Sequence, residues 1–204
     1  MQDNKYLDDL HEIRQMMRKS TLFLSLSGLS GVLAGVYALI GAAVVYKLLQ
    51  HHYLYYPYVI IESKTFKAII AVALLVLVAS VLTAYLFSMR KAKRNDEKLI
   101  TPTAKRAFYN FALPLLTGGA LCILLINNGH YGLLAPMTLI FYGLACVNVS
   151  KYTFGDVHYL GITEIILGLL AVQFSGYGLL FWSLGFGVCH ILYGGVKYFK
   201  YERK

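Results

Sequence analysis

The chain has 204 residues, of which 58% are hydrophobic and only 14% are charged, and its formal net charge is +9. A soluble domain has roughly a quarter of its residues charged, so this composition excludes an ordinary soluble protein. The apolar stretches reach about 18 residues or more, the length that a helix needs to cross a bilayer. They are apolar all round, as at 68–87, whereas barrel strands would alternate apolar and polar residues. The sequence therefore predicts an all-α integral membrane bundle.

The positive net charge does not indicate a nucleic-acid partner. Lys and Arg lie in short segments between apolar spans, where they set the orientation of a membrane protein. The partners that we expect are the lipid bilayer and, within it, a second copy of the chain or another membrane protein. Cys122, Cys146 and Cys189 lie far apart inside apolar spans, without metal-ligand or redox spacing. We therefore expect no metal site and no cofactor.

Residues 1–20 are predicted to form an amphipathic N-terminal helix, because apolar residues recur there every three or four positions. This helix either lies on the membrane surface or a partner, or is a polar lead-in to the first span. A transmembrane domain follows at 21–198, and a basic tail occupies 199–204. The six predicted transmembrane helices within this domain are 21–49, 66–89, 108–127, 132–150, 159–175 and 177–198.

The first span carries a repeat of small residues, Ser27, Gly31 and Gly35, at every fourth position. Small residues at this spacing allow two membrane helices to approach closely. The motif therefore predicts a helix–helix contact, with either another span of the same chain or a second subunit as the partner.

The run SLSGLSGVLAGVYALIG at 25–41 resembles the first span of an uncharacterised family of small polytopic bacterial membrane proteins. The resemblance implies a bacterial inner (cytoplasmic) membrane. The family carries no activity that could be transferred to this chain.

The last four spans contain an internal repeat. A shift of 46 residues places the YGLL turn at 131–134 on the YGLL turn at 177–180, and KY at 151–152 on KY at 197–198. Each unit is then a hairpin that enters and leaves on the same side. We therefore predict that the third to sixth spans form two parallel hairpin repeats.

One acidic residue, Glu164 on the fifth span, and one histidine, His190 on the sixth, lie well inside the spans. A charged group in hydrocarbon costs at least about 2.5–3.5 kcal/mol, so such residues face protein or water and are functional candidates. Counted from the turn at 175–176, they lie about 17 and 21 Å deep, at 1.5 Å per residue. We predict that they are neighbours on two facing stripes of small residues. The stripes are Gly161, Glu164, Gly168, Ala171 and Ser175 on the fifth span, and Ser183, Gly187, His190 and Gly194 on the sixth.

Two amides, Asn110 and Asn148, lie near the same level on the third and fourth spans. With Glu164 and His190 they form the candidate polar site inside the membrane, as a pocket opening inward. The Glu–His pair itself could be a proton-sensitive element, or it could only join two helices.

Three classes of function follow from these features. A membrane-embedded interaction or regulatory protein is favoured, because the spans offer few polar residues to line a path for a solute. The alternative is a small transporter or channel that uses the site around Glu164 and His190. An intramembrane enzyme needs several convergent acid, base or metal groups, so we expect that the chain is not an enzyme.

Orientation follows from charge. If the spans alternate in direction, 16 of the 19 Lys and Arg fall on one side of the membrane. The side rich in Lys and Arg is cytoplasmic, so we predict a multi-pass protein with a cytoplasmic N-terminus and a cytoplasmic C-terminus.

A labelling experiment tests this topology. In a chain without native cysteines, Asp96→Cys and Ser63→Cys should react with an impermeant reagent from opposite sides of the membrane, Asp96→Cys from the cytoplasm. Reaction of both from the outer side would contradict the topology.

Overall fold

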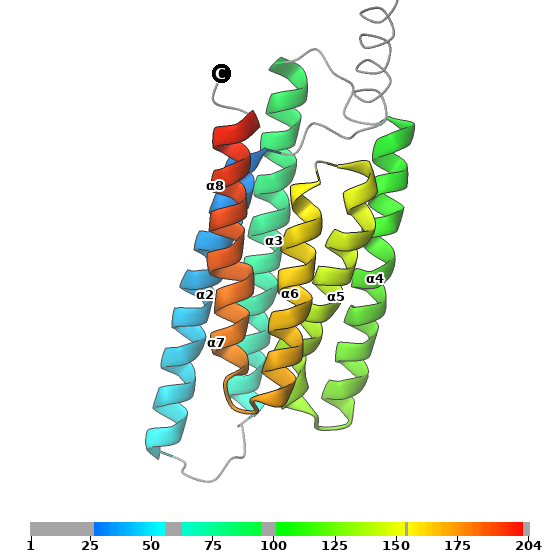
Figure 1. The fold of residues 1–204 in the computed structure, drawn as a ribbon. Coiled ribbons are helices and arrows are strands. Elements are labelled where there is room, and N and C mark those ends of the chain that lie inside the picture. Colours follow the sequence, from blue (N-terminus) through cyan, green and yellow to red (C-terminus); the bar gives the residue numbers. More distant parts are fainter. Residues whose placement is uncertain (1–26, 56–62, 95–100, 154, 202–204) are drawn as a thin grey trace, which may run out of the picture.

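The structure is a computed structural model, and it describes residues 27–55, 63–94, 101–153 and 155–201. The predicted helix at 1–20 and residues 202–204 of the predicted tail lie outside these ranges. The described part is all-α, with six spans that are long and apolar enough to cross a membrane (Figure 1).

Five spans are single helices, and the sixth consists of three segments in series. The single helices are α2 (Gly28–Tyr55), α3 (Ser63–Arg94), α4 (Pro102–Asn127), α5 (Leu134–Val149) and α6 (Asp156–Gln173). The last span consists of α7 (Gly178–Trp182), the π-helical η3 (Ser183–Cys189) and α8 (His190–Tyr201). Short 3-10 turns, η1 (Tyr131–Leu133) and η2 (Ser150–Tyr152), flank α5. The predicted six-helix bundle is confirmed.

The start of α4 differs from the prediction, which placed it at residue 108. The Thr101 hydroxyl accepts a hydrogen bond from the Ala104 amide at 3.0 Å, and Pro102 occupies the first helical position. A capping Thr followed by Pro is a strong helix start. The prediction followed the apolar stretch, whereas the Thr101–Pro102 pair sets the boundary.

Glycines in a left-handed conformation follow two helices. Gly129 after α4 has φ 76°, and Gly176 after α6 has φ 97°. A residue without Cβ adopts this conformation without strain, so both glycines suit tight helix ends. The helices before them end at Asn127 and Gln173, which are 46 residues apart. This agrees with the shift of the predicted repeat, although the repeat itself stays a prediction.

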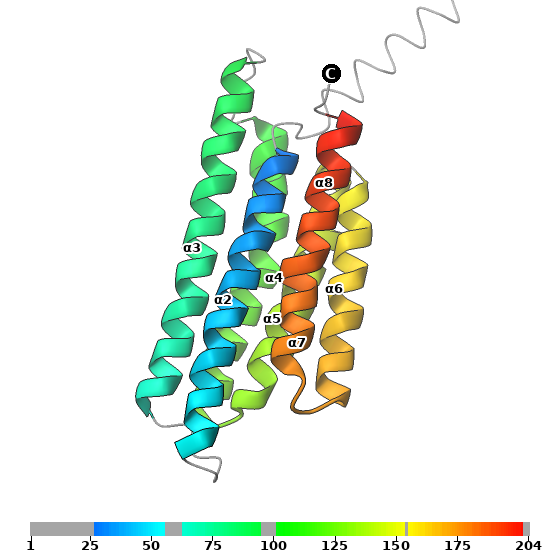
Figure 2. The same cartoon turned by 90° about the vertical axis from the view of Figure 1, so that its left-hand side faces the viewer.

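The helices pack in the order α4, α5, α6, last span, α2, α3. Figure 2 shows α2 between α3 and α8, with α6 on the far side of α8. The last span therefore lies between α6 and α2, while α3 and α4 are outermost. The last span therefore contacts both α6 and α2.

The predicted contact of the first span is present, and its partner is the last span of the same chain. A Cβ at Gly35 would lie 2.6 Å from the Gly187 carbonyl oxygen, and one at Gly31 would lie 3.3 Å from the Gly194 Cα. Ser27, at the start of the same face, is buried. The two backbones thus approach as closely as glycine allows.

Glycines also bring α5 and α6 together. A Cβ at Gly143 would lie 2.6 Å from the Gly161 carbonyl oxygen, and one at Gly161 would lie 2.7 Å from the Gly143 carbonyl oxygen. In the described part, glycine faces glycine across two pairs of helices, α2 with the last span and α5 with α6; we call these the glycine-packed pairs.

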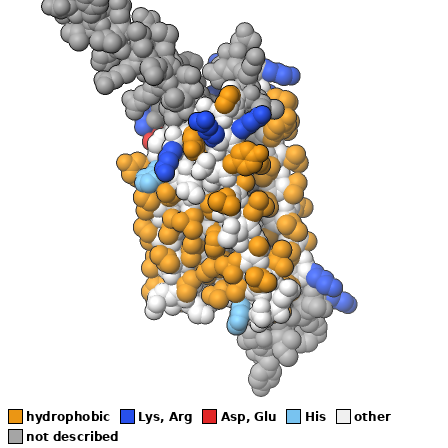
Figure 3. Space-filling model, turned by 90° about the vertical axis from the view of Figure 1, so that its right-hand side faces the viewer, with side chains coloured by type: hydrophobic (Ala, Val, Ile, Leu, Met, Phe, Trp, Pro, Cys, Tyr) orange, Lys and Arg blue, Asp and Glu red, His pale blue; other side chains and the backbone are white. Residues whose placement is uncertain are grey.

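Charge divides the described part into two ends. Figure 3 shows a broad band of hydrophobic side chains between the ends, with Lys and Arg at its margins. We call the end at which α2 begins and α8 ends the basic end (Figure 1). Its described basic residues are Arg90, Lys91, Lys93, Arg94, Lys105, Arg106, Lys151, Lys197 and Lys200; those towards the opposite end are Lys47, Lys64 and Lys67.

The glycine contact makes a direct prediction. Gly35→Leu should destabilise the protein by about 1–3 kcal/mol, because the side chain would overpack the contact with Gly187. The control is Gly119→Leu, at an exposed position on α4 where a Cβ would meet nothing within 4 Å. Denaturation in detergent measures the stability of both variants. Equal stabilities of the two variants would contradict the close contact between Gly35 and Gly187.

Candidate functional site

Glu164 lies in the interior of the bundle. It is on the face of α6 that also buries Leu160, Gly161 and Gly168, and its exposed fraction is 0%. Neither of its carboxylate oxygens has a hydrogen-bond partner among the described residues. A buried carboxylate without hydrogen bonds is costly unless it is neutralised by a proton or a cation.

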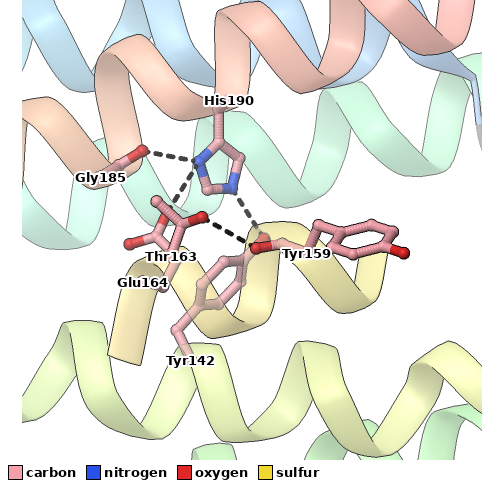
Figure 4. Close-up of polar contacts among 6 residues, drawn as sticks. All are labelled: Tyr142, Tyr159, Thr163, Glu164, Gly185 and His190. Carbon is pink, nitrogen blue, oxygen red and sulfur yellow. Dashed lines mark hydrogen bonds and ion pairs between the residues drawn. The ribbon is translucent and has the colours of Figure 1, made fainter. Parts of the chain in front are cut away.

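His190 provides the adjacent ionisable group. Its Nδ1 lies 3.4 Å from Glu164 Oε1, so the two residues are neighbours as the sequence predicted (Figure 4). His190 is also buried, at the junction between η3 and α8. A proton on either group leaves a pair without net charge.

Two further contacts fix the imidazole. Its Nδ1 lies 3.1 Å from the Gly185 carbonyl oxygen, and its Nε2 lies 2.8 Å from the Tyr142 hydroxyl (Figure 4). In the neutral ring with a proton on Nδ1, this N–H donates towards Gly185 while the Tyr142 hydroxyl donates to Nε2. In the imidazolium both nitrogens donate, and Tyr142 becomes the acceptor. The contacts therefore accommodate both charge states of the ring.

Aromatic rings surround the imidazole. Phe186 stacks on it with ring centroids 5.8 Å apart, and Tyr142 lies 5.2 Å away. Trp182 packs on Phe186 at 5.1 Å, and Phe111 of α4 packs edge-on against Tyr142 at 6.0 Å. The pair is thus enclosed by side chains from α4, α5 and the last span. Low polarity on these sides strengthens the interaction between the two groups.

The π-helical segment brings the last span close to the carboxylate. A Cβ at Gly185 would collide with Glu164 Oε2 and with the Leu139 side chain, so only glycine leaves room for the acid. Gly185 and Gly187 are both buried in this segment. A π segment adds backbone to a helical turn and is often found at functional sites.

The predicted facing of the small-residue stripes is wrong. Gly161 and Gly168 pack against Gly143 and Ile140 of α5, and Gly187 and Gly194 pack against α2. Small residues mark close helix contacts, but they do not specify the partner. Glu164 and His190 meet instead through the space at Gly185.

The two amides of the predicted site are not brought to the pair. The Asn110 side chain donates to the Arg106 carbonyl of its own helix at 2.9 Å, and Asn148 is exposed on α5. Neither takes part in the polar contacts drawn in Figure 4. The described contacts thus form a site of Glu164, His190 and Tyr142 rather than an inward-opening pocket with both amides.

Sequence reasoning missed Tyr142, Gly185 and the aromatic rings. One signal was present for Tyr142, because tyrosines in membrane proteins gather at the interfaces and this one lies in the middle of its span. No comparable signal identifies Gly185, because glycines are frequent in transmembrane helices.

Comparisons with protein families, curated proteins and solved structures gave no match. Among the described residues, no three His, Cys, Asp or Glu side chains are grouped in a way that could hold a metal ion. The arrangement that is present places a carboxylate and an imidazole 3.4 Å apart, so that one proton on either group leaves the pair without net charge.

The role of Gly185 is testable. Gly185→Ala should displace either the carboxylate or the last span, and so lower stability and shift the emission of Trp182, the only tryptophan in the chain. Gly195→Ala is the matched control, because it lies on the same span and its Cβ would meet nothing within 4 Å. Identical emission spectra and melting curves for both variants would exclude this role.

Proposed function

We propose that this chain is a membrane-embedded interaction or regulatory protein, in which the Glu164–His190 pair couples proton binding to the packing of the last span. The observation that carries the proposal is the fully buried carboxylate 3.4 Å from a buried imidazole inside a membrane bundle. Ionisable groups in this setting are functional candidates by default.

The coupling follows from charge and position. With one shared proton the pair has no net charge, whereas loss or gain of a proton leaves a buried charge between α6 and the last span. The cost of that charge falls when the two helices separate or when water enters. Because the last span also packs on α2 through Gly31 and Gly35, such a movement would reach the first span.

The proposed setting is a bacterial inner membrane with both termini in the cytoplasm. The resemblance of the first span supports the membrane. The excess of Lys and Arg at the basic end supports the orientation. A second copy of the chain or another membrane protein is the proposed recipient of the signal.

A small transporter or channel is the second candidate. A lone carboxylate within the membrane favours it, because such acids mark proton and ion pathways. Proton flux into liposomes that contain the purified protein, measured under a pH gradient, separates the two. Flux that disappears in Glu164→Gln would establish transport, whereas a proton response without flux supports the regulatory function.

The proton response itself is measurable through Trp182. Its ring packs on Phe186, which stacks on His190, so a change in the charge of the pair should alter its emission. We expect the emission to change with pH, because gain or loss of a proton changes the charge of the pair next to these rings. Glu164→Gln and His190→Gln should each abolish this change in emission or move it to a different pH.

Asp156→Asn is the matched control, because it neutralises an exposed acid on the same helix, 3.3 Å from Lys200. It should leave the response of Trp182 unchanged. Emission that is independent of pH in the unmodified protein would refute the proposed function.

A further inference from the structure

A groove runs along the outward face of α8. Its volume is about 570 Å³, within the roughly 300–1,000 Å³ of ordinary ligand sites. Gly195 leaves this space open, because a Cβ at its position would meet nothing within 4 Å. The face is turned away from buried His190, so the groove is separate from the polar site. The described residues that line it all belong to α8 and are Ile191, Leu192, Gly195, Val196, Phe199 and Lys200.

The polarity of the groove changes along its length. Lys200 lies in the last turn of α8, at the basic end, and its ammonium contacts Asp156 at 3.3 Å. The other lining residues are apolar and continue to Ile191, towards the middle of the span. At 1.5 Å per residue, the stretch from Lys200 back to Ile191 covers about 14 Å. This is close to half of the hydrocarbon thickness of a bilayer, about 30 Å. The groove thus has the depth of one leaflet and a cation at its outer end.

Charge at this end favours an anionic ligand. Nine of the described Lys and Arg residues lie there, whereas Asp156 is the only acid among the described residues of that end. Basic clusters next to transmembrane helices attract anionic lipids. A second copy in the same orientation, seated in the groove, would bring two basic ends together, and like charges repel. Charge complementarity therefore selects an anionic lipid over a second copy of this chain.

We propose that the groove binds an acyl chain of an anionic phospholipid whose phosphate contacts Lys200. The apolar side chains pack against the acyl chain, and the ammonium donates charge-assisted hydrogen bonds to the phosphate oxygens. An exposed ion pair adds little stability, so the contact with Asp156 does not prevent this binding. The inference concerns a separate face of α8 and does not rest on the proposed function.

The experiment uses the full chain with a single tryptophan in the groove. Trp182→Phe removes the one native tryptophan, and Phe199→Trp places another in the lining. The protein is reconstituted in vesicles of equal parts phosphatidylglycerol and phosphatidylcholine, with bromine on the acyl chains of one lipid or the other. Bromine quenches a tryptophan that it touches. The two samples therefore give the preference of the groove for the anionic lipid.

A second site at the same end separates the groove from general attraction. Phe108→Trp, in the same Trp182→Phe background, lies on α4 close to Arg106. Phe108 and Phe199 are similarly exposed, at 67% and 63%. The basic end attracts anionic lipid to both sites, whereas the groove acts at Phe199 alone. We expect the preference at Phe199→Trp to be higher by about fivefold, the contribution of one Lys at a membrane surface.

Substitutions in the lining test the site directly. Lys200→Gln should lower the preference about fivefold, and Lys200→Arg should retain it, because the charge remains. Gly195→Leu should abolish the preference by filling the groove, and the open space around Gly195 accepts the side chain without unfolding. The matched controls are Lys151→Gln, an exposed basic residue of the same end, and Asp156→Asn, which removes the ion pair but not the lysine. Neither control should lower the preference.

Three results would overturn the inference. They are equal preferences at Phe199→Trp and Phe108→Trp, a preference unchanged by Lys200→Gln or by Gly195→Leu, and weak quenching of Phe199→Trp by both lipids. The last result would mean that a second copy or another part of this chain fills the groove.

Native mass spectrometry of the unmodified chain with the same two lipids decides if the tryptophan variants do not fold. The phosphatidylglycerol adduct should dominate and should decline in Lys200→Gln, and equal adducts of the two lipids would overturn the inference. None of these outcomes concerns the polar site, so the proposed function is tested separately.

Discussion

The burial of one carboxylate inside the membrane constrains the rest of the bundle. Glu164 has no access to water, and the hydrocarbon outside the bundle cannot solvate it. The last span must therefore bring His190 within reach, and it does so where Gly185 leaves room for the acid. The Tyr142 hydroxyl and the Gly185 carbonyl then fix the imidazole, so residues of three spans depend on the position of one acid.

The two glycine-packed pairs hold this site in place. α5 and α6 form one close pair, and α2 and the last span form the other. Glu164 belongs to the first pair of helices and His190 to the second, so the two residues meet across the boundary between the pairs. Because packed glycine contacts resist adjustment, a change in the charge of the pair is expected to move one pair of helices against the other rather than distort either.

The sequence was sufficient for the parts that depend on hydrophobicity and depth. The six spans follow from apolar length, and the position of Glu164 beside His190 follows from similar distances to a shared turn. It did not predict which helices the small residues contact, because a glycine face fits any close neighbour. The π segment and the burial of Lys197 arise from tertiary packing, which local pattern does not encode.

Protonation of Glu164 can be tested directly by infrared difference spectroscopy of the membrane-reconstituted protein between acid and neutral pH. The account predicts a carboxylic acid C=O band that changes with pH, is absent in Glu164→Gln, and changes at a different pH in His190→Gln. A spectrum in which Glu164→Gln removes no band, or in which His190→Gln leaves the titration unchanged, would contradict a proton shared by the two residues.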